Sequence, residues 1–211
     1  MLESSPGMHA ETIAHLSRID SVMAELTKRL DPPDIKPRRL TPFQSLGRSI
    51  IYQQLNGKAA GTILGRFQAL FSKADQFPKP EEVLQMDVER LRGAGLSRPK
   101  ASYMRDLAQK ALDGEVPALK DCDLLTDAEL IERLTRIKGI GRWTVEMLLI
   151  FNLGRPDVLP VHDLGVRRGF QIAYRKRKLP EPEQLDRYGK RWAPYRSTAA
   201  WYLWSAADED D

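Results

Sequence analysis

Residues 134–147 carry the most distinctive chemical pattern in the sequence. Two glycines one residue apart, Gly139 and Gly141, form a short turn between two apolar, helix-forming segments. Glycine adopts positive φ at no steric cost and leaves the backbone N–H groups uncovered, and N–H groups at the start of a helix bind a phosphate through hydrogen bonds and the helix dipole. Lys138 and Arg142 flank the turn and would add positive charge. The pattern predicts a phosphate site, although a Gly-x-Gly turn also occurs in ordinary connections between helices.

Helices must position this turn, because helix start signals and helical apolar spacing recur along most of the chain. Thr41-Pro42-Phe43-Gln44 and Thr126-Asp127-Ala128-Glu129 each place a capping threonine three residues before Gln or Glu. The expected helices span residues 13–30, 41–55, 58–71, 97–112, 126–137 and 195–206, besides the one that follows the glycine turn. Since no segment alternates apolar and polar residues, we predict an all-α fold of about nine to eleven helices.

The charge of the chain is modest overall but uneven along its length. Its 211 residues include 33 Lys+Arg and 29 Asp+Glu, a formal net charge of +4, and residues 208–211 are all acidic. Between residues 164 and 178 there is no acidic residue, and the basic ones are Arg167, Arg168, Arg175, Lys176, Arg177 and Lys178. Such a cluster is typical of a phosphate-binding surface, and equally of a solvated helix end.

Composition excludes several classes of protein. Cys122 is the only cysteine, which excludes an internal disulfide framework, a cysteine-based zinc site and a four-cysteine iron–sulfur cluster. No apolar run approaches the roughly 18–20 residues that a membrane helix needs. The start of the chain lacks the apolar stretch of a signal peptide. We therefore expect a soluble protein of a reducing compartment.

The glycine turn and three other segments together resemble the helix-hairpin-helix DNA glycosylases in which a Gly/Pro-rich hairpin is followed by an aspartate (HhH-GPD). Those segments are residues 49–60 (SIIYQQLNGKAA), 95–101 (GLSRPKA) and 191–204 (RWAPYRSTAAWYLW). Within that superfamily, the chain looks most like the alkylation-repair branch, the DNA-3-methyladenine glycosylase II type.

The resemblance implies a two-lobed helical fold with the active site in the cleft between the lobes. It places the glycosylase domain at residues 37–211, with the hairpin at 134–152 and the acidic tail at 208–211. An N-terminal helix within residues 1–36 would pack on this core. The extra N-terminal β-domain of some relatives has no room here, so we expect a compact form.

The same resemblance assigns the catalytic role to Asp163, which follows Gly141 by 22 residues. Loss of a base builds positive charge on the deoxyribose, and a carboxylate beside C1′ stabilises that charge and can help deprotonate the attacking water. The local sequence is also that of an N-cap, because Asp163 precedes an expected helix at Leu164. For His162 an acid–base role is open, but we favour a packing or phosphate contact.

An extruded base is held by stacking in an apolar, aromatic pocket, and a cationic alkylated base is attracted by electron-rich rings. The implied pocket residues are Trp143, Met147, Trp204, Ser205, Tyr52 and Gln53. Met147 and Ser205 stand where relatives can carry further aromatics, which implies a roomier pocket. We assign Trp192 and Trp201 to the core, and a core position is also the common one for any single tryptophan on an apolar helix.

Base extrusion leaves a gap in the duplex that a side chain must fill. Relatives insert their wedge from the segment that contains Gln54, Leu55 and Asn56, although these residues also suit a plain polar helix end. The expected DNA-binding residues are Gln54, Leu55, Asn56, Lys138, Gly139, Gly141, Arg142, His162 and Arg167.

The residue at position 143 indicates the type of reaction. Relatives with lyase activity carry there a lysine whose amine attacks C1′, whereas this chain has Trp143. The resemblance therefore implies a monofunctional hydrolase that leaves an abasic site without cutting the strand. No cofactor is required, but the backbone carbonyls of Thr135, Ile137 and Ile140 could hold a structural Na⁺ or K⁺ at the hairpin.

Taken together, the resemblance implies release of alkylated purines, chiefly 3-methyladenine and also 7-methylguanine, from duplex DNA. We expect a monomer located in the cytoplasm with the nucleoid, or in the nucleus of a eukaryote. Two alternatives stay open: a hairpin module that only binds DNA, and a glycosylase for another lesion such as ethenoadenine, hypoxanthine or an oxidised base.

Overall fold

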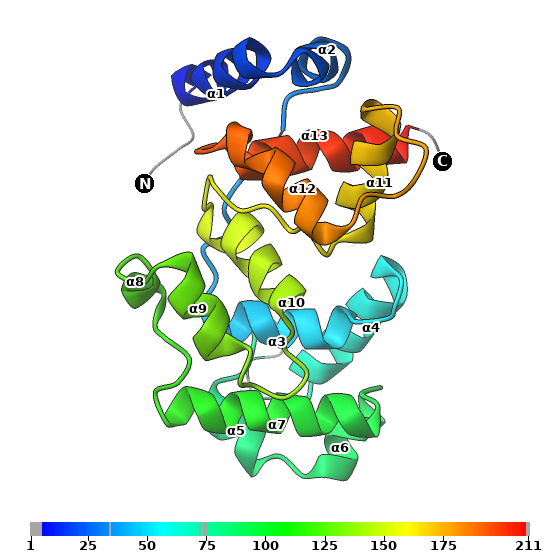
Figure 1. The fold of residues 1–211 in the computed structure, drawn as a ribbon. Helices are drawn as coiled ribbons and strands as arrows, with labels where there is room; N and C mark the ends of the chain where they lie inside the picture. Colours follow the sequence, from blue (N-terminus) through cyan, green and yellow to red (C-terminus); the bar gives the residue numbers. More distant parts are fainter. Residues whose placement is uncertain (1–5, 34, 72, 74–75, 210–211) are drawn as a thin grey trace. The chain divides into compact units, whose positions relative to one another are not determined.

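The computed structural model describes residues 6–33, 35–71, 73 and 76–209, and every regular element within these ranges is a helix (Figure 1). The all-α prediction is confirmed. These ranges hold thirteen α-helices, a π-helix and a 3-10 helix, more than expected, because the short helices α5, α6 and α8 cover only four to six residues each. Windows that short show no apolar periodicity. Among the described helices, none has the length and apolarity needed to cross a bilayer.

The chain folds into two compact units, which we call the middle unit and the terminal unit. The middle unit comprises Arg39–Leu148. The terminal unit comprises Met1–Arg38 together with Leu149–Asp211, so both ends of the chain contribute to it.

The described residues of the middle unit form the helices from α3 to α10. They are α3 (Pro42–Tyr52), α4 (Gly57–Gln68), α5 (Pro80–Gln85), α6 (Val88–Gly93), α7 (Arg98–Leu112), α8 (Leu119–Cys122), α9 (Asp127–Leu134) and α10 (Arg142–Met147). Helix α7 packs against α3 and α5, and its Met104 and Leu107 are fully buried. These contacts build the apolar core that supports the hairpin between α9 and α10.

Local capping sets where the middle helices begin, as the sequence predicted. The hydroxyl of Thr41 accepts from the N–H of Gln44 at 3.2 Å and starts α3. Thr126 accepts from the N–H of Glu129, whose carboxylate in turn accepts from the N–H of Thr126 at 2.7 Å. The Thr126 hydroxyl also donates to the Glu129 carboxylate at 2.7 Å, and this bond, followed by the one from the Thr126 backbone N–H, lowers the pKa of Glu129 below its ordinary value. Start signals are local chemistry, which is why the sequence alone locates them.

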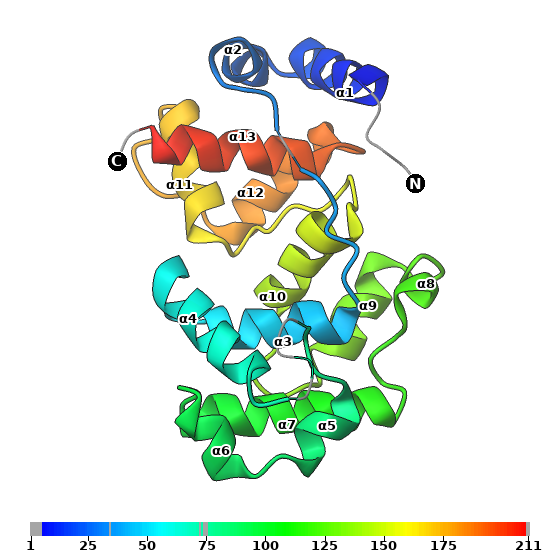
Figure 2. The same cartoon turned by 180° about the vertical axis from the view of Figure 1, so that it is seen from behind.

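The terminal unit is organised around its last helix. Its elements are α1 (Pro6–Ile19), α2 (Ser21–Arg29), the π-helix η1 (Leu148–Leu153), α11 (Leu164–Ala173), α12 (Pro182–Gly189), the 3-10 helix η2 (Lys190–Trp192) and α13 (Arg196–Asp208). Helix α13 contacts α2 on one side and α11 on another (Figure 2). A Cβ at Gly169 of α11 would overlap the backbone carbonyl of Leu203, so the backbones of α11 and α13 are in direct contact there.

The single helix expected over residues 13–30 is wrong, because Asp20 divides that segment into α1 and α2. The buried carboxylate of Asp20 caps α2 through the N–H of Val22 at 3.0 Å. Its other oxygen accepts from the Tyr174 hydroxyl at 2.7 Å and from the Trp192 indole at 3.0 Å. Burial, followed by the bond to Asp20, raises the pKa of Tyr174 above its ordinary value. Asp20 thus joins the N-terminal helices to the rest of the terminal unit.

Candidate active site

The hairpin has the glycine geometry that the sequence pattern requires. Gly139 has φ +78°, and a Cβ there would lie 2.3 Å from the ring of Tyr103 on α7. The N–H of Ile140 donates to the carbonyl of Ile137 at 3.1 Å and closes the turn. Gly141 precedes α10 and has open space around its missing side chain. Gly139 is therefore required by conformation and packing, whereas the absence of a side chain at Gly141 only leaves the backbone uncovered.

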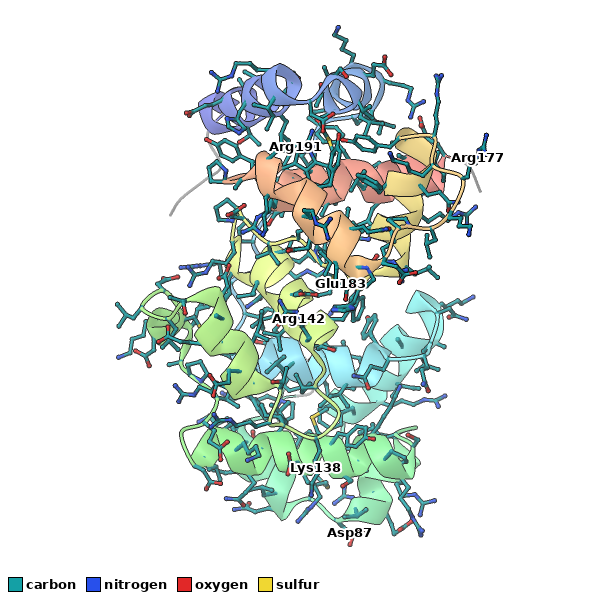
Figure 3. The ribbon with its side chains drawn as sticks, viewed as in Figure 1. Asp87, Lys138, Arg142, Arg177, Glu183 and Arg191 are labelled. Carbon is teal, nitrogen blue, oxygen red and sulfur yellow. The ribbon has the colours of Figure 1, made fainter. Side chains whose placement is uncertain are left out.

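Two cations flank the hairpin, Lys138 and Arg142, both labelled in Figure 3. Each has a carboxylate partner. The backbone N–H of Lys138 donates to Asp106 at 2.9 Å, and its ammonium lies 3.9 Å from the same carboxylate. The guanidinium of Arg142 donates to the buried carboxylate of Glu146 at 2.9 Å. Both basic side chains are more than half exposed. They supply positive charge at the turn, but the N–H of Lys138 is already occupied.

The turn after α3 is hydrogen-bonded to the hairpin, and both belong to the middle unit. Helix α3 ends at Tyr52, earlier than the expected Leu55, and the side-chain amide of Gln53 donates to the carbonyl of Gly139 at 2.9 Å. Lys100 on α7 donates to the carbonyls of Ile51 and Gln53 at 2.8 and 2.7 Å. Burial lowers the pKa of Lys100 below its ordinary value. Lys100 lies in the segment 95–101, but its residue type and position alone do not indicate this role.

The side chains that follow Gln53 lie at the surface. Gln54 adopts the left-handed conformation with φ +58°, and Leu55 is 39% exposed. Asn56 caps α4 by accepting from the N–H of Ala59 at 2.9 Å, so it also has a structural role. Tyr52 is partly exposed, with the guanidinium of Arg48 above its ring.

Trp143 and Met147 lie one turn apart on α10. Trp143 is 48% exposed, which is unusual for so large an apolar side chain and distinguishes it from a core tryptophan. Met147 is half-buried. Trp192 is fully buried, as expected of a core residue, whereas Trp201 is only half-buried.

Asp163 and Trp204 meet within the terminal unit. The Oδ1 of Asp163 accepts from the N–H of Val166 at 2.8 Å, which makes Asp163 the N-cap of α11. The same oxygen accepts from the indole N–H of Trp204 at 2.8 Å. The Trp204 ring lies near Phe151, with the ring centres 5.8 Å apart. A Cβ at Gly165 would come within 2.9 Å of the indole and 3.2 Å of Oδ1. Capping thus fixes the carboxylate next to an aromatic ring.

The remaining predicted residues of the terminal unit differ in their setting. His162 is exposed beside Asp163, and the hydroxyl of half-buried Ser205 donates to the carbonyl of Trp201. Arg167 turns inward, because its guanidinium donates to the carbonyl of Pro180 at 2.8 Å and its side chain is only 18% exposed. The sequence shows the charge of Arg167 but not its direction. The basic residues 175–178 are exposed.

In the part of the chain that the structure describes, no group of three or more His, Cys, Asp or Glu side chains could hold a metal ion. At the hairpin, Thr135 ends α9 as its C-cap, and the carbonyl of Ile137 accepts the turn-closing bond. Since a carbonyl oxygen has two lone pairs, that bond leaves room for a cation contact.

Known proteins with a similar sequence and fold show the family of this chain. Residues 48–194 match the family described as HhH-GPD superfamily base excision DNA repair protein. The DNA-3-methyladenine glycosylase 1 of Schizosaccharomyces pombe is 41% identical over 195 residues, 92% of this chain and 85% of that protein. A structure of the S. pombe 3-methyladenine DNA glycosylase with abasic DNA has 40% identity and a TM-score of 0.82, covering 92% of this chain and 95% of its own.

A bacterial structure is as similar in fold. The DNA-3-methyladenine glycosidase of Bacillus halodurans has 37% identity and a TM-score of 0.84, covering 93% of this chain and 88% of its own. The family match covers well over half of the chain, and the relatives align along nearly their whole length. This chain belongs to the HhH-GPD superfamily of base excision DNA repair proteins.

Proposed function

We propose that this protein is a monofunctional DNA glycosylase that hydrolyses the N-glycosidic bond of alkylated purines in duplex DNA. Its substrates are 3-methyladenine, chiefly, and 7-methylguanine, and its product is an abasic site in an uncut strand. The observation that carries the proposal is the Asp163 carboxylate, held on Oδ1 by the N–H of Val166 and by the indole of Trp204. The names of the relatives, which are 3-methyladenine glycosylases, support the choice of substrate.

Asp163 acts on the sugar. As the base departs, positive charge develops at C1′, and a fixed carboxylate stabilises that charge without reorganising. The same carboxylate accepts a proton from the attacking water, whose oxygen bonds to C1′ while the bonding electrons leave with the base. A purine alkylated at N3 or N7 is already cationic and leaves as a neutral base, so no separate acid is needed to protonate it.

Trp204 and Trp143 serve the base. An extruded cationic base is held by stacking and by attraction to the faces of aromatic rings. Trp204 is bonded to the carboxylate, so a base beside this indole brings its own sugar toward Asp163. Trp143 is exposed on α10 and has no amine, so it cannot form the Schiff base on which strand cleavage depends. Met147 near Trp143 in the middle unit and Ser205 next to Trp204 in the terminal unit add no further aromatic face for a base.

The hairpin and the turn after α3 form the proposed DNA interface of the middle unit. The uncovered backbone at Gly141 would bind a phosphate, with added charge from Lys138 and Arg142. Leu55 is exposed two residues after Gln53, whose side chain is hydrogen-bonded to the hairpin. It would act as the wedge that fills the gap left by the base. The contacts of Arg167 within the protein favour a role in holding its loop rather than DNA.

A monovalent cation at the hairpin would be structural. The carbonyls of Thr135, Ile137 and Ile140 would hold it, and it would bring positive charge to the phosphate bound at the turn. The protein would act as a monomer wherever cellular DNA is, in the nucleoid or in the nucleus.

The experiment that tests the proposed function measures free bases and strand breaks on the same substrate. Duplex DNA methylated at purines is incubated with the wild-type protein, the released bases are separated by chromatography, and the strand is examined before and after alkali. We expect free 3-methyladenine and 7-methylguanine, with breaks only after alkali. Breaks without alkali would contradict the monofunctional mechanism. Tight binding without release from alkylated, deaminated or oxidised DNA would leave only a DNA-binding module.

A further inference from the structure

The segment that leads to Asp163 has no regular structure of its own. Residues 154–163 form neither helix nor strand, yet they end at the carboxylate whose position decides the proposed chemistry. A flexible segment would spread that carboxylate over many positions, and a misplacement of about 1 Å can cost about 100-fold in rate. Something outside the segment must therefore hold it.

The first residue of α13, Arg196, makes a bidentate ion pair with this segment. The guanidinium of Arg196 donates to both carboxylate oxygens of Asp157, from Nε at 2.7 Å and from Nη2 at 2.9 Å. The backbone N–H of Arg196 also donates to Asp157 at 3.3 Å. Helix α13 has no capping side chain at Tyr195, so Asp157 supplies the acceptor that the helix start lacks. Two charged bonds from one guanidinium to one carboxylate fix direction as well as distance.

The second residue of α13 binds the same segment through its hydroxyl and its backbone. The hydroxyl of Ser197 accepts from the N–H of Val158 at 3.0 Å and lies 2.7 Å from the carbonyl of Arg155, to which it can donate. The N–H of Ser197 donates to the carbonyl of Pro156 at 3.0 Å. Ser197 and Val158 are both buried. Four successive residues, 155–158, are thus bonded to the first turn of α13.

The far end of the segment is bonded to the same helix. Ser197 and Trp204 are seven residues apart, which places them on one face of α13 about 10 Å apart. Trp204 binds the Asp163 carboxylate. Between the two anchors, Leu159 is buried and the N–H of Asp163 closes a turn on the carbonyl of Pro160 at 2.9 Å. One face of α13 therefore spans the whole segment.

We propose that Arg196 and Ser197 are positioning residues, which set the place of the Asp163 carboxylate by fixing residues 155–158 to α13. The inference rests on the proposed function, since it assigns Asp163 the catalytic role. Neither residue touches the base or the sugar in this scheme. Their contribution appears in the rate of bond cleavage and not in the affinity for DNA.

The test compares Arg196→Met with Arg196→Lys and with a matched control, Arg191→Met. Arg191 belongs to the same unit, but its guanidinium lies over the ring of Tyr188, 3.8 Å from the ring centre, and donates to the carbonyl of Tyr188 at 3.2 Å. Each variant is assayed for the single-turnover rate of base release at saturating enzyme, for affinity to abasic-site DNA and for melting temperature. Arg196→Lys keeps the positive charge beside Asp157 but replaces the bidentate pair with a single contact. The fold is therefore retained even where Arg196→Met is too unstable to assay.

We expect Arg196→Met to lower the single-turnover rate about 10- to 100-fold, with Arg196→Lys between it and the wild type. Affinity for abasic-site DNA and the rate of Arg191→Met should stay within about 2-fold of the wild type. A rate unchanged in Arg196→Lys, or a loss of rate matched by an equal loss of affinity, would overturn the inference. If the wild type itself releases no base, the proposed function fails. If it does so and Asp163→Asn does not, but the Arg196 variants behave as the wild type, only this inference fails.

Discussion

Gly165 allows the link between Asp163 and Trp204 to be disturbed without changing either side chain. In Gly165→Ala the new Cβ would lie 2.9 Å from the indole Cδ1 of Trp204 and 3.2 Å from the Oδ1 of Asp163, where ordinary contacts begin at 3.4 Å. To relieve the closer contact, the indole must move by about 0.5 Å, which weakens its 2.8 Å bond to the carboxylate.

The expected result of Gly165→Ala is a loss of rate with little change in stability. Alanine in the first turn of α11 gains up to about 1 kcal/mol of helix propensity, which offsets part of the steric cost. Because a displacement of about 1 Å costs about 100-fold, a shift of half that size should lower the rate of base release about 10-fold. Gly65→Ala is the control, since a Cβ at Gly65 on α4 meets nothing within 4 Å.

The assay is single-turnover release of 7-methylguanine from methylated duplex DNA, with urea unfolding of each variant. We expect Gly165→Ala to lose about 10-fold in rate while its unfolding free energy stays within about 1 kcal/mol of the wild type. Gly65→Ala should retain the wild-type rate. A Gly165→Ala protein that is as fast as the wild type would refute the reasoning that the bond between Trp204 and Asp163 matters for catalysis.

Three further outcomes follow from the contacts described above. Asp20→Ala leaves the buried donors of Tyr174 and Trp192 without their acceptor, so urea unfolding should show a loss of about 3–5 kcal/mol, and a loss under about 1 kcal/mol would contradict the account. Gly139→Ala should destabilise the protein by more than about 1 kcal/mol because of its positive φ and the ring beside it, whereas Gly141→Ala should melt as the wild type does. Burial raises the pKa of Asp157, but the hydrogen bonds and charge of Arg196 lower it by more, so the net pKa lies below the ordinary value. The ion pair therefore stabilises the fold above about pH 4 and is lost as the pH falls further, so the stability difference between the wild type and Arg196→Met should be largest near pH 7 and shrink in acid.

Features set by neighbouring residues could be read from the sequence, and features set by distant contacts could not. The helix starts at Thr41 and Thr126 and the turn at Gly139 are local, and the structure confirms them. The division at Asp20 interrupts an apolar pattern that reads as continuous, because its partners, such as Tyr174, lie more than 150 residues away.

The candidate site shows the same distinction. The family and its fold were predicted from the motif around Gly141 and Asp163, and both are confirmed. The role of Lys100 does not follow from its local sequence, since the carbonyls it binds lie at the end of α3, about 50 residues earlier. The pairing of Arg196 with Asp157 spans 39 residues and likewise leaves no trace in the local sequence. Residue type and spacing thus indicate the chemistry, but only the fold shows which side chains hold the reacting groups in place.

The most direct test of the central claim compares Asp163→Asn with Asp87→Asn. Asp87 caps α6 in the way that Asp163 caps α11, and asparagine caps helices as well as aspartate does, so both variants should fold. At enzyme concentrations that saturate methylated duplex DNA, we expect Asp163→Asn to bind with wild-type affinity and to lose base release by at least about 100-fold, while Asp87→Asn keeps the full rate. Wild-type release by Asp163→Asn would contradict the assignment of the catalytic carboxylate.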